Sequence, residues 1–433
     1  MALPEIERAF PESSRAAISW VSTGYLVSVA GLMLVAGRMG DVLGRKRVFQ
    51  VGLLVLAGGS LLTGIAPTVV TLIVARMIQG IGGALVTATG LTLVLSDLPA
   101  ERQPFAIGIW GSVGSAAAVL GPTLGAEVLD LTNWRFTVAL IGPISLVTLL
   151  AGRSVLLEAT DPDAPRRLEP VSVALATIGI GGVALGLSQS RLWGWTGGRT
   201  WAALAVGVVA FALFLDRSRR LDDALLDLRL FGHRALRGAT ISAGLQQLGF
   251  FSWFFSTSFV LREIWGWSVR DTGQAISIAF VFSAASGWFS GKAAERFGYF
   301  WPTAIGALVS ASGCLYWYVA FDADPSFWIV YLPGAALFGL GGGACGVLTT
   351  GIALRDVGAA DQGMAYAAHQ AVRRMSSAAG LALMATLLGE ASGAELLGGG
   401  RNVWLMSAGA HLVMILPLIP NRERRLGRVA SAA

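Results

Sequence analysis

Long apolar stretches recur along almost the whole chain, and no other sequence feature constrains the fold as strongly. Each is roughly 17 to 25 residues long, which is enough for a helix to cross a hydrocarbon core about 30 Å thick. The composition agrees, because 54% hydrophobic and only 13% charged residues leave too little polar surface for a soluble domain of 433 residues. We therefore predict an all-α polytopic membrane protein.

The pattern predicts thirteen membrane-spanning helices, of which the seventh is near the lower limit of length. A polar segment follows Met1, so no signal peptide is expected. The predicted spans are residues 16–36, 48–65, 69–94, 105–126, 136–157, 171–189, 201–215, 238–261, 272–290, 302–320, 327–352, 363–388 and 403–420.

The loops are too short for a soluble catalytic domain, and they contain no nucleophile, metal-binding or phosphate-binding motif. We therefore expect neither an enzyme nor an ATP-driven pump. Cys314 and Cys345 both fall inside predicted spans, where they are interpreted as core residues and not as a disulfide or a metal site. No metal and no cofactor are expected.

Arginine and lysine gather in alternate loops, and this asymmetry predicts the orientation of the chain. The loop after the first span, the loop after Arg153, the segment from Arg217 to Arg237 and the basic C-terminal tail are expected in the cytoplasm, with the N-terminus outside. The net charge of +6 needs no nucleic acid, because anionic lipid headgroups face the same arginines. The 56 glycines and only two lysines are typical of a GC-rich bacterial genome, which favours a bacterial cytoplasmic (inner) membrane.

The loop between the first two spans, GRMGDVLGRKRV from Gly37 to Val48, is the most specific local motif. Gly37 and Gly44 permit a tight turn, Asp41 lies among cations, and the basic residues are expected to face lipid headgroups. An ordinary basic loop is the alternative interpretation. The spacing resembles the signature loop of the major facilitator superfamily, in which the acid pairs with nearby cations and a facing helix N-terminus to close a cytoplasmic gate. That resemblance implies a gate formed by Gly37, Asp41, Gly44, Arg45, Lys46 and Arg47.

The third span contains LIVARMIQGIGGA, which matches an Arg-x-x-Gln-Gly pattern of the same superfamily. Arg76 lies within the membrane, where a cation is costly and usually functional. Gln79 and Gly80 follow at helical spacing, so the three share one face. The resemblance implies a coupling role for Arg76; the alternative is that Arg76 extends to the outer interface.

The fourth span carries a stripe of small residues in which Gly114, Gly121 and Gly125 recur with Pro122 among them. Such a face lets a second helix approach closely, and proline bends the helix at that level. A generic packing face is the alternative. The Gly-x6-Gly-Pro-x2-Gly string resembles the antiporter motif of drug/proton exporters, and we expect this stripe to pack the two bundles together.

The resemblance extends over nearly the whole chain and is closest to the fourteen-helix drug/proton antiporter family of multidrug efflux proteins. It implies two pseudo-symmetric bundles joined by two linking helices. A degenerate second gate loop, with Gly291, Glu295 and Gly298, keeps the glycines and the acid but has lost the basic pair. Such repeats underlie alternating access. The implied division is residues 1–157 for the N-terminal bundle, 158–220 for the linking helices, 221–420 for the C-terminal six-helix bundle and 421–433 for a basic tail.

Ala2, Leu3 and Pro4 resemble the residues that close the first helix of that family. We therefore expect that most of the first helix is missing, through a misassigned start, and that thirteen visible spans correspond to fourteen. Proton-coupled export usually needs a buried carboxylate, yet none of the thirteen predicted spans contains Asp or Glu. In the family resembled, such an acid lies in the first helix.

Aromatic and polar residues within spans are candidates for a substrate cavity. The aromatic residues could instead face lipid or the membrane interface. The adjacent amides of Gln246 and Gln247 are better candidates, because an unpaired amide in an apolar helix is costly. His369 and Arg373 share a helix face, whereas His411 is expected to be a packing histidine. The candidate residues are Tyr25, Trp110, Gln246, Gln247, Phe250, His369 and Arg373.

Three functions remain open. The leading hypothesis is a monomeric, proton-driven exporter of hydrophobic or amphipathic small molecules such as drugs and antibiotics. The second is a carrier of the same fold that moves an organic anion or metabolite without a buried carboxylate, as the arginines within spans suggest. The third is a membrane protein that no longer transports, such as a partner subunit or a sensor.

Overall fold

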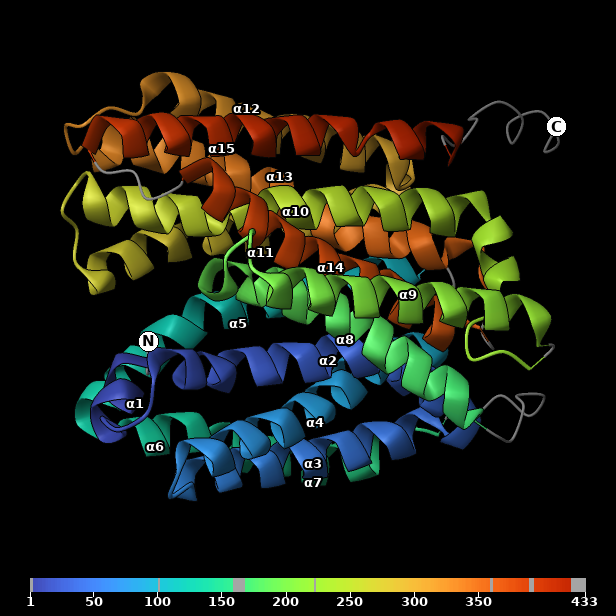
Figure 1. Ribbon diagram of the computed structural model, residues 1–433. Helices are drawn as coiled ribbons and strands as arrows, with labels where there is room; N and C mark the ends of the chain where they lie inside the picture. The colour runs from blue at the N-terminus through green and yellow to red at the C-terminus, as the bar shows by residue number, and fades with distance from the viewer. Residues whose placement is uncertain are drawn as a thin grey trace, which may run out of the picture.

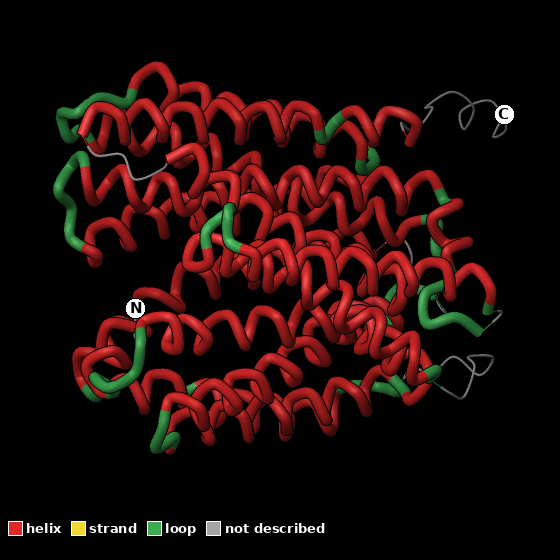
Figure 2. Tube along the Cα trace, viewed as in Figure 1, coloured by secondary structure: helices red, strands yellow, loops and turns green. Residues whose placement is uncertain are grey.

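A computed structural model describes residues 3–99, 102–158, 168–221, 223–358, 361–388 and 393–421. Within these ranges the chain forms helices joined by short loops and contains no strand, as Figure 2 shows. The helices run roughly side by side in two halves, one above the other in Figure 1. Helix α1 lies at one end of the helices, and the described part of the chain ends, after α15, at the other end.

The first half consists of long helices around α2 and α4 (Figure 1). Helix α2 packs on α4, α4 packs on α3, and α3 packs on α7. The predicted span at 136–157 is split into two helices, since Leu140 separates α6 from α7. The elements are α1 (Leu3–Ala9), α2 (Arg15–Leu43), α3 (Arg45–Ile65), α4 (Val69–Ser96), α5 (Gln103–Leu131), α6 (Trp134–Ala139) and α7 (Ile141–Val155).

Helices α8 (Pro170–Trp193) and α9 (Gly198–Arg220) follow as an antiparallel pair. Helix α8 contacts α2 of the first half and α14 (Gln362–Leu388) of the second, so the pair lies along the junction. The predicted span 201–215 was too short, because α9 continues through a charged last turn to a length of 23 residues. Glu169 caps α8 by accepting bonds from the backbone of Val171 and Ser172, and Arg217 donates to both its oxygens at 2.9 and 3.0 Å.

The second half is built on α10, which packs on α13, α14 and α15. A π-helical turn, η3, leads into α13, and a 3-10 turn, η4, follows α15. The elements are η2 (Leu228–Gly232), α10 (Arg234–Glu263), α11 (Val269–Phe297), α12 (Phe300–Ala320), η3 (Phe327–Tyr331), α13 (Leu332–Arg355), α14, α15 (Gly393–Val413) and η4 (Leu416–Asn421).

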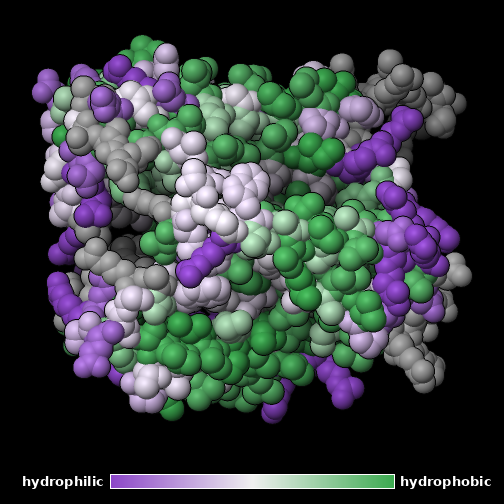
Figure 3. All heavy atoms as spheres, viewed as in Figure 1, coloured by the Kyte–Doolittle hydropathy of each residue, from purple (hydrophilic) through white to green (hydrophobic). Residues whose placement is uncertain are grey.

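Ten helical segments of the described chain are long and apolar enough to cross a membrane. Three further helices, α10, α11 and α14, coincide with predicted spans but are more polar, so the count of thirteen stays a prediction. Figure 3 shows hydrophobic residues in a broad band across the helices and hydrophilic residues mainly at the two ends. The all-α polytopic membrane fold is thus confirmed.

Helix ends are set by local sequence. Thr68 and Thr71 form a reciprocal capping box at the start of α4, and Asn133 caps α6 through Phe136. Between α2 and α3 the turn is a single residue, Gly44, whose φ of +98° would strain any residue with a side chain. The tight turn predicted at this loop is therefore present, and it fixes the start of α3 beside the end of α2.

Two helix pairs make the most extensive contacts between the two halves. Helix α5 packs on α11, where Ser112 donates to the carbonyl of Ala284 at 2.8 Å and the hydroxyls of Ser115 and Ser283 lie 3.0 Å apart. Helix α2 packs on α14 across a glycine, since a Cβ at Gly37 would overlap Ala367. These two contacts frame the space between the halves.

Candidate functional site

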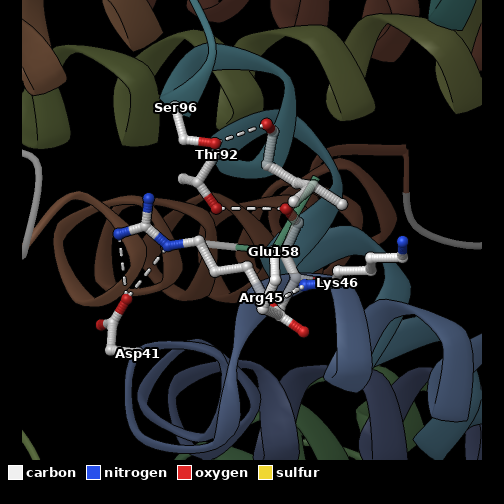
Figure 4. A network of polar contacts seen from close by, with 8 residues as sticks. Asp41, Arg45, Lys46, Thr92, Ser96 and Glu158 are labelled. Carbon is white, nitrogen blue, oxygen red and sulfur yellow. Dashed lines mark hydrogen bonds and ion pairs between the residues drawn. The ribbon is translucent and has the colours of Figure 1, made fainter. Parts of the chain in front are cut away.

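The first part of the site is a buried ion pair at the end of α2. Arg45 donates to Oδ1 of Asp41 through Nη2 at 3.1 Å and Nε at 3.3 Å, and the side chains are 5% and 1% exposed. Figure 4 shows the guanidinium of Arg45 turned toward this carboxylate. Burial of both partners with direct hydrogen bonds makes the pair far less screened than a surface salt bridge.

The same carboxylate faces the start of α14 in the other half. The backbone N–H of Met364 donates toward Asp41, and Gly363 lies so close that a Cβ there would overlap the carboxylate oxygen. A helix N-terminus carries unpaired N–H groups and a partial positive charge, so it favours an anion at this position. Asp41 thus holds α2 and α3 against α14, across the junction of the halves.

One expectation for this loop was wrong. Arg45 was expected to face lipid headgroups, but it is buried because its guanidinium is needed to pair Asp41 away from water. Arg47 is exposed, as expected. Lys46 takes a third position, since its ammonium donates to the carbonyls of Arg153 at 3.1 Å and Leu156 at 2.6 Å, near the C-terminal end of α7.

Glu158 completes this corner, and sequence reasoning missed it. Its carboxylate accepts from the backbone N–H groups of Lys46 at 2.9 Å and Arg47 at 3.2 Å, at the N-terminus of α3 (Figure 4). A Cβ at Gly44 would lie 2.7 Å from this carboxylate, a second reason for glycine at that position. Glu158 therefore caps the N-terminus of α3, and Lys46 caps the C-terminal end of α7. An acid about 110 residues along the chain gave no local signal of this contact.

Arg76 lies between α4 and α2. Its Nε donates to the carbonyl of Val21 at 3.1 Å, its Nη1 donates to Gln79, and its guanidinium lies 4.5 Å from the centre of the Tyr25 ring. Gln79 is 1% exposed and passes the network on to Ser60 of α3 at 3.2 Å. These bonds turn Arg76 toward its neighbouring helix. Gly80 permits the close approach, because a Cβ there would lie 2.7 Å from the carbonyl of Tyr25.

The α5 stripe is placed differently from the expectation. A Cβ at Gly114, Gly121 or Gly125 would meet nothing within 4 Å in the described part of the chain, so these glycines do not pack the two halves together. The contact with α11 uses Gly108 and Ser112, on a neighbouring face of α5. Helix α5 is continuous through Pro122, and the structure describes the backbone of this residue only.

The second gate loop, with Gly291, Glu295 and Gly298, keeps the glycine turn of the first loop but not its buried ion pair. Gly298 ends α11 with a φ of +76°, and Gly291 packs on α5, where a Cβ would lie 3.1 Å from the carbonyl of Pro104. Glu295 is exposed, and no ion pair or hydrogen bond of its side chain occurs among the described residues. The loss of the basic pair from this loop agrees with an unpaired acid.

A cavity of about 410 Å³ lies between the two halves, with walls from α4 and α5 on one side and α10, α11, α13 and α14 on the other. Five of the seven predicted cavity residues line it: Trp110, Gln246, Gln247, Phe250 and Arg373. Tyr25 instead stacks against Arg76. His369 is fully buried between α14 and α10, with Nδ1 3.3 Å from the hydroxyl of Thr240.

Helix α14 contributes both arginines of the cavity lining. Arg373 is held by the carbonyl of Gly346 at 3.1 Å, Thr350 Oγ1 at 3.4 Å and Gln247 Oε1 at 3.3 Å, so it ties α14 to α13 and α10. Three further residues of α14 that the cavity list from sequence missed also line it: Tyr366, Gln370 and Arg374. Their spacing of four from Tyr366 to Gln370 and from Gln370 to Arg374 places them on one helix face, which is the signal that could have found them.

His411 behaves as expected of a packing histidine. Its Nδ1 lies 2.8 Å from the carbonyl of Ser407, and its ring packs edge-on against Phe338 at 5.4 Å. It lies outside the cavity lining.

Two resistance proteins of Streptomyces are similar to this chain. It is 28% identical over 376 residues to the tetracenomycin C resistance and export protein of Streptomyces glaucescens, covering 87% of this chain and 70% of that protein. It is 29% identical over 413 residues to the puromycin resistance protein pur8 of Streptomyces alboniger, covering 93% and 80%.

Solved structures show the same fold at low sequence identity. The human organic anion transporter MFSD10 (TETRAN) aligns with a TM-score of 0.68 at 15% identity, over 96% of this chain and 88% of that one. The proton:xylose symporter XylE aligns with a TM-score of 0.65 at 15% identity, over 96% and 90%. The model of the Major Facilitator Superfamily matches residues 2–381. With the fold and the match along most of its length, the chain belongs to the Major Facilitator Superfamily of membrane transporters.

Proposed function

We propose that the protein exports hydrophobic or amphipathic small molecules from a bacterial cell in exchange for protons, by alternating access. The observation that carries this proposal is the cavity between the halves, because both halves supply its walls. A site built in that way changes its access when one half rocks against the other. The size of about 410 Å³ is in the range of sites for drug-sized ligands.

The contact of Asp41 with Arg45 and the start of α14 would be the gate on the cytoplasmic side. The positive-inside rule supports this orientation, since Arg38, Arg45, Lys46 and Arg47 lie at that end of the helices. With the gate closed, α2 and α14 are held together and the cavity is shut off from the cytoplasm. Opening requires that the N-terminus of α14 leaves the carboxylate.

The named relatives support export of drugs rather than uptake of nutrients. Two are a resistance and export protein for tetracenomycin C and a resistance protein for puromycin. Others are a multidrug resistance protein of Mycobacterium tuberculosis and a cephamycin export protein of Amycolatopsis lactamdurans. The identities of 28% to 29% over most of the chain favour a related type of substrate.

Asp41 also offers a way to couple the gate to protons. It is the only buried acid in the described part of the chain, and its Oδ2 has no hydrogen-bond partner there. A proton on this carboxylate would remove its attraction to Arg45 and to the start of α14, so protonation favours the open gate. Arg76, braced between α2 and α4, would transmit movement of α2 within the first half.

The test uses purified protein in liposomes that contain a pH-sensitive dye, with the cation ethidium and the anion 1-pyrenesulfonate as substrates. If transport exchanges substrate for protons, substrate that enters the liposomes is matched by protons that leave, so the internal pH rises. Substrate that leaves the liposomes should lower the internal pH. Liposomes with a Gly37→Leu variant, whose side chain would overlap Ala367, should show neither change. If neither compound moves and an imposed pH gradient has no effect, the proposal is wrong.

The second candidate is a carrier of the same fold that moves its substrate without protons. The cavity lining favours this candidate, because none of the described lining residues is Asp or Glu and the cavity therefore has no carboxylate to carry a proton. The same liposomes separate the two candidates, because substrate movement at constant internal pH supports the uncoupled carrier.

A further inference from the structure

Two neighbouring arginines line the cavity, and they differ in what holds them. Arg373 makes hydrogen bonds to the carbonyl of Gly346, to Thr350 and to Gln247, so its donors are largely used within the protein. Arg374 also lines the cavity and is half-buried, yet no hydrogen bond and no ion pair of its side chain occurs in the part of the chain that the structure describes. Its guanidinium is therefore available to a ligand.

The cavity has no acid to balance these charges. No described lining residue is Asp or Glu, and the hydroxyl of Tyr366, which also lines the cavity, accepts a hydrogen bond from Trp110. Two cations facing a partly enclosed, largely apolar space raise the electrostatic potential there more than they would in water. A ligand that brings its own negative charge is favoured, and a cation is repelled.

Two side chains of the cavity carry unpaired acceptors. The side-chain oxygens of Gln246 and Gln370 are buried and lack a hydrogen-bond partner in the described structure. A buried acceptor without a partner is costly, so a ligand that donates a hydrogen bond gains free energy by pairing it. One wall of the cavity is aromatic, with Phe250, Trp253 and Phe338 in mutual contact at centroid distances of 4.0 to 6.0 Å.

From these observations we infer that the cavity selects amphipathic organic anions, with Arg374 as the residue that binds the acid group. The ligand would carry an aromatic or apolar body against the Phe250 wall, a carboxylate or sulfonate at Arg374, and a hydrogen-bond donor for Gln246 or Gln370. A guanidinium suits this task, because its planar N–H groups match both oxygens of a carboxylate. The inference rests on the proposed transport function and names the substrate class of the same site.

The experiment compares three probes with one aromatic body and different charge: pyrenebutyrate, 4-(1-pyrenyl)butanol and 4-(1-pyrenyl)butylamine. Binding to the full chain in nanodiscs is measured by energy transfer from tryptophan to pyrene, with empty nanodiscs as the blank. We expect pyrenebutyrate to bind more tightly than the alcohol and the amine to bind most weakly. Arg374→Gln should weaken pyrenebutyrate about tenfold and leave the alcohol unchanged.

Three variants keep this test decisive. Arg374→Lys retains the charge and should keep part of the preference for the anion. Arg229→Gln, at an exposed position in η2 away from the cavity, should change no affinity. Thermal melting of Arg374→Gln should match the unmodified protein, since no bond within the protein is lost. If the amine binds as tightly as pyrenebutyrate, or if Arg374→Gln leaves pyrenebutyrate binding unchanged, the inference is overturned.

Failure of the site and failure of transport give different results. Binding with a preference for the anion, but without movement of pyrenebutyrate in liposomes, contradicts the proposed function and supports the anion site. Movement of all three probes at similar rates, without dependence on Arg374, supports transport and contradicts the anion site.

Discussion

Oδ1 of Asp41 lies so close to the backbone of Gly363 that no side chain fits between them. Asp41 belongs to the last turn of α2 and Gly363 to the first turn of α14, so this contact joins the two halves of the molecule. Glycine is required here by the close approach, which brings the N-terminal end of α14 to the carboxylate.

Gly363→Ala should therefore open this contact. The added Cβ forces the carboxylate and the start of α14 apart, and overpacking of this kind costs about 1–3 kcal/mol. We expect a lower melting temperature and a loss of transport in the liposome assay. Gly358→Ala is the matched control, since a Cβ at that position would meet nothing within 4 Å. Equal effects of the two substitutions would contradict the role assigned to the contact.

Arg45 and Arg47 provide a second test, because they are neighbours with different surroundings. Arg45→Ala leaves Asp41 buried without its ion-pair partner, a change that typically costs about 3–5 kcal/mol. Arg47 is exposed, and Arg47→Ala should stay within about 0.5 kcal/mol. Chemical unfolding in detergent measures both. Similar losses for the two variants would show that the loop acts through its total charge rather than through this pair.

Sequence patterns predicted most of this fold, for identifiable reasons. Apolar stretches that suffice to cross a bilayer are a local property, so the approximate positions of the helices followed directly. The prediction missed the first residues and the charged last turn of α9, and the break between α6 and α7. The turn at Gly44 and the pairing of Asp41 with a cation also depend on residues close together in the chain.

Contacts between distant segments were not predictable in the same way. Glu158 caps α3 although about 110 residues separate it from Lys46, and nothing in its own neighbourhood indicated that partner. The stripe on α5 was expected to pack the two bundles together, but Gly114, Gly121 and Gly125 make no such contact in the described chain, and the serines at 112 and 115 bond to α11 instead. Tertiary packing, rather than local pattern, decided both cases.

Arg76 and Gln79 form the third test. If Arg76 is held by Gln79 and the carbonyl of Val21, then Arg76→Met and Gln79→Met should each destabilise the protein by about 1–3 kcal/mol, because each leaves a buried partner unpaired. The double variant should lose less than the sum of the two, by an interaction energy of about 0.5–3 kcal/mol. Melting curves of the unmodified protein, the two single variants and the double variant measure this interaction energy. Strict additivity would favour the alternative in which Arg76 extends to the membrane interface.

Glu169 supplies a test by pH. The hydrogen bonds from Arg217 lower the pKa of the Glu169 carboxyl from 4.5 to about 2, with further help from Ser172 and Val171 at the start of α8. A pKa that folding lowers gives stability that is fully present above pH 4.5 and is lost as the pH falls toward 2. Glu169→Gln should therefore melt at a lower temperature than the unmodified protein at pH 6.

That difference should narrow as the pH falls from 6 toward 3, because the unfolded state of the unmodified protein takes up a proton that its folded state resists. The size at pH 6 is expected to be about 1 kcal/mol, the usual contribution of a helix N-cap. Asp216→Asn is the control, since its ion pair with Arg220 is exposed and such pairs contribute little. A Glu169→Gln difference that stays constant over this range would contradict the role of the ionised carboxylate and leave only the shape of the cap.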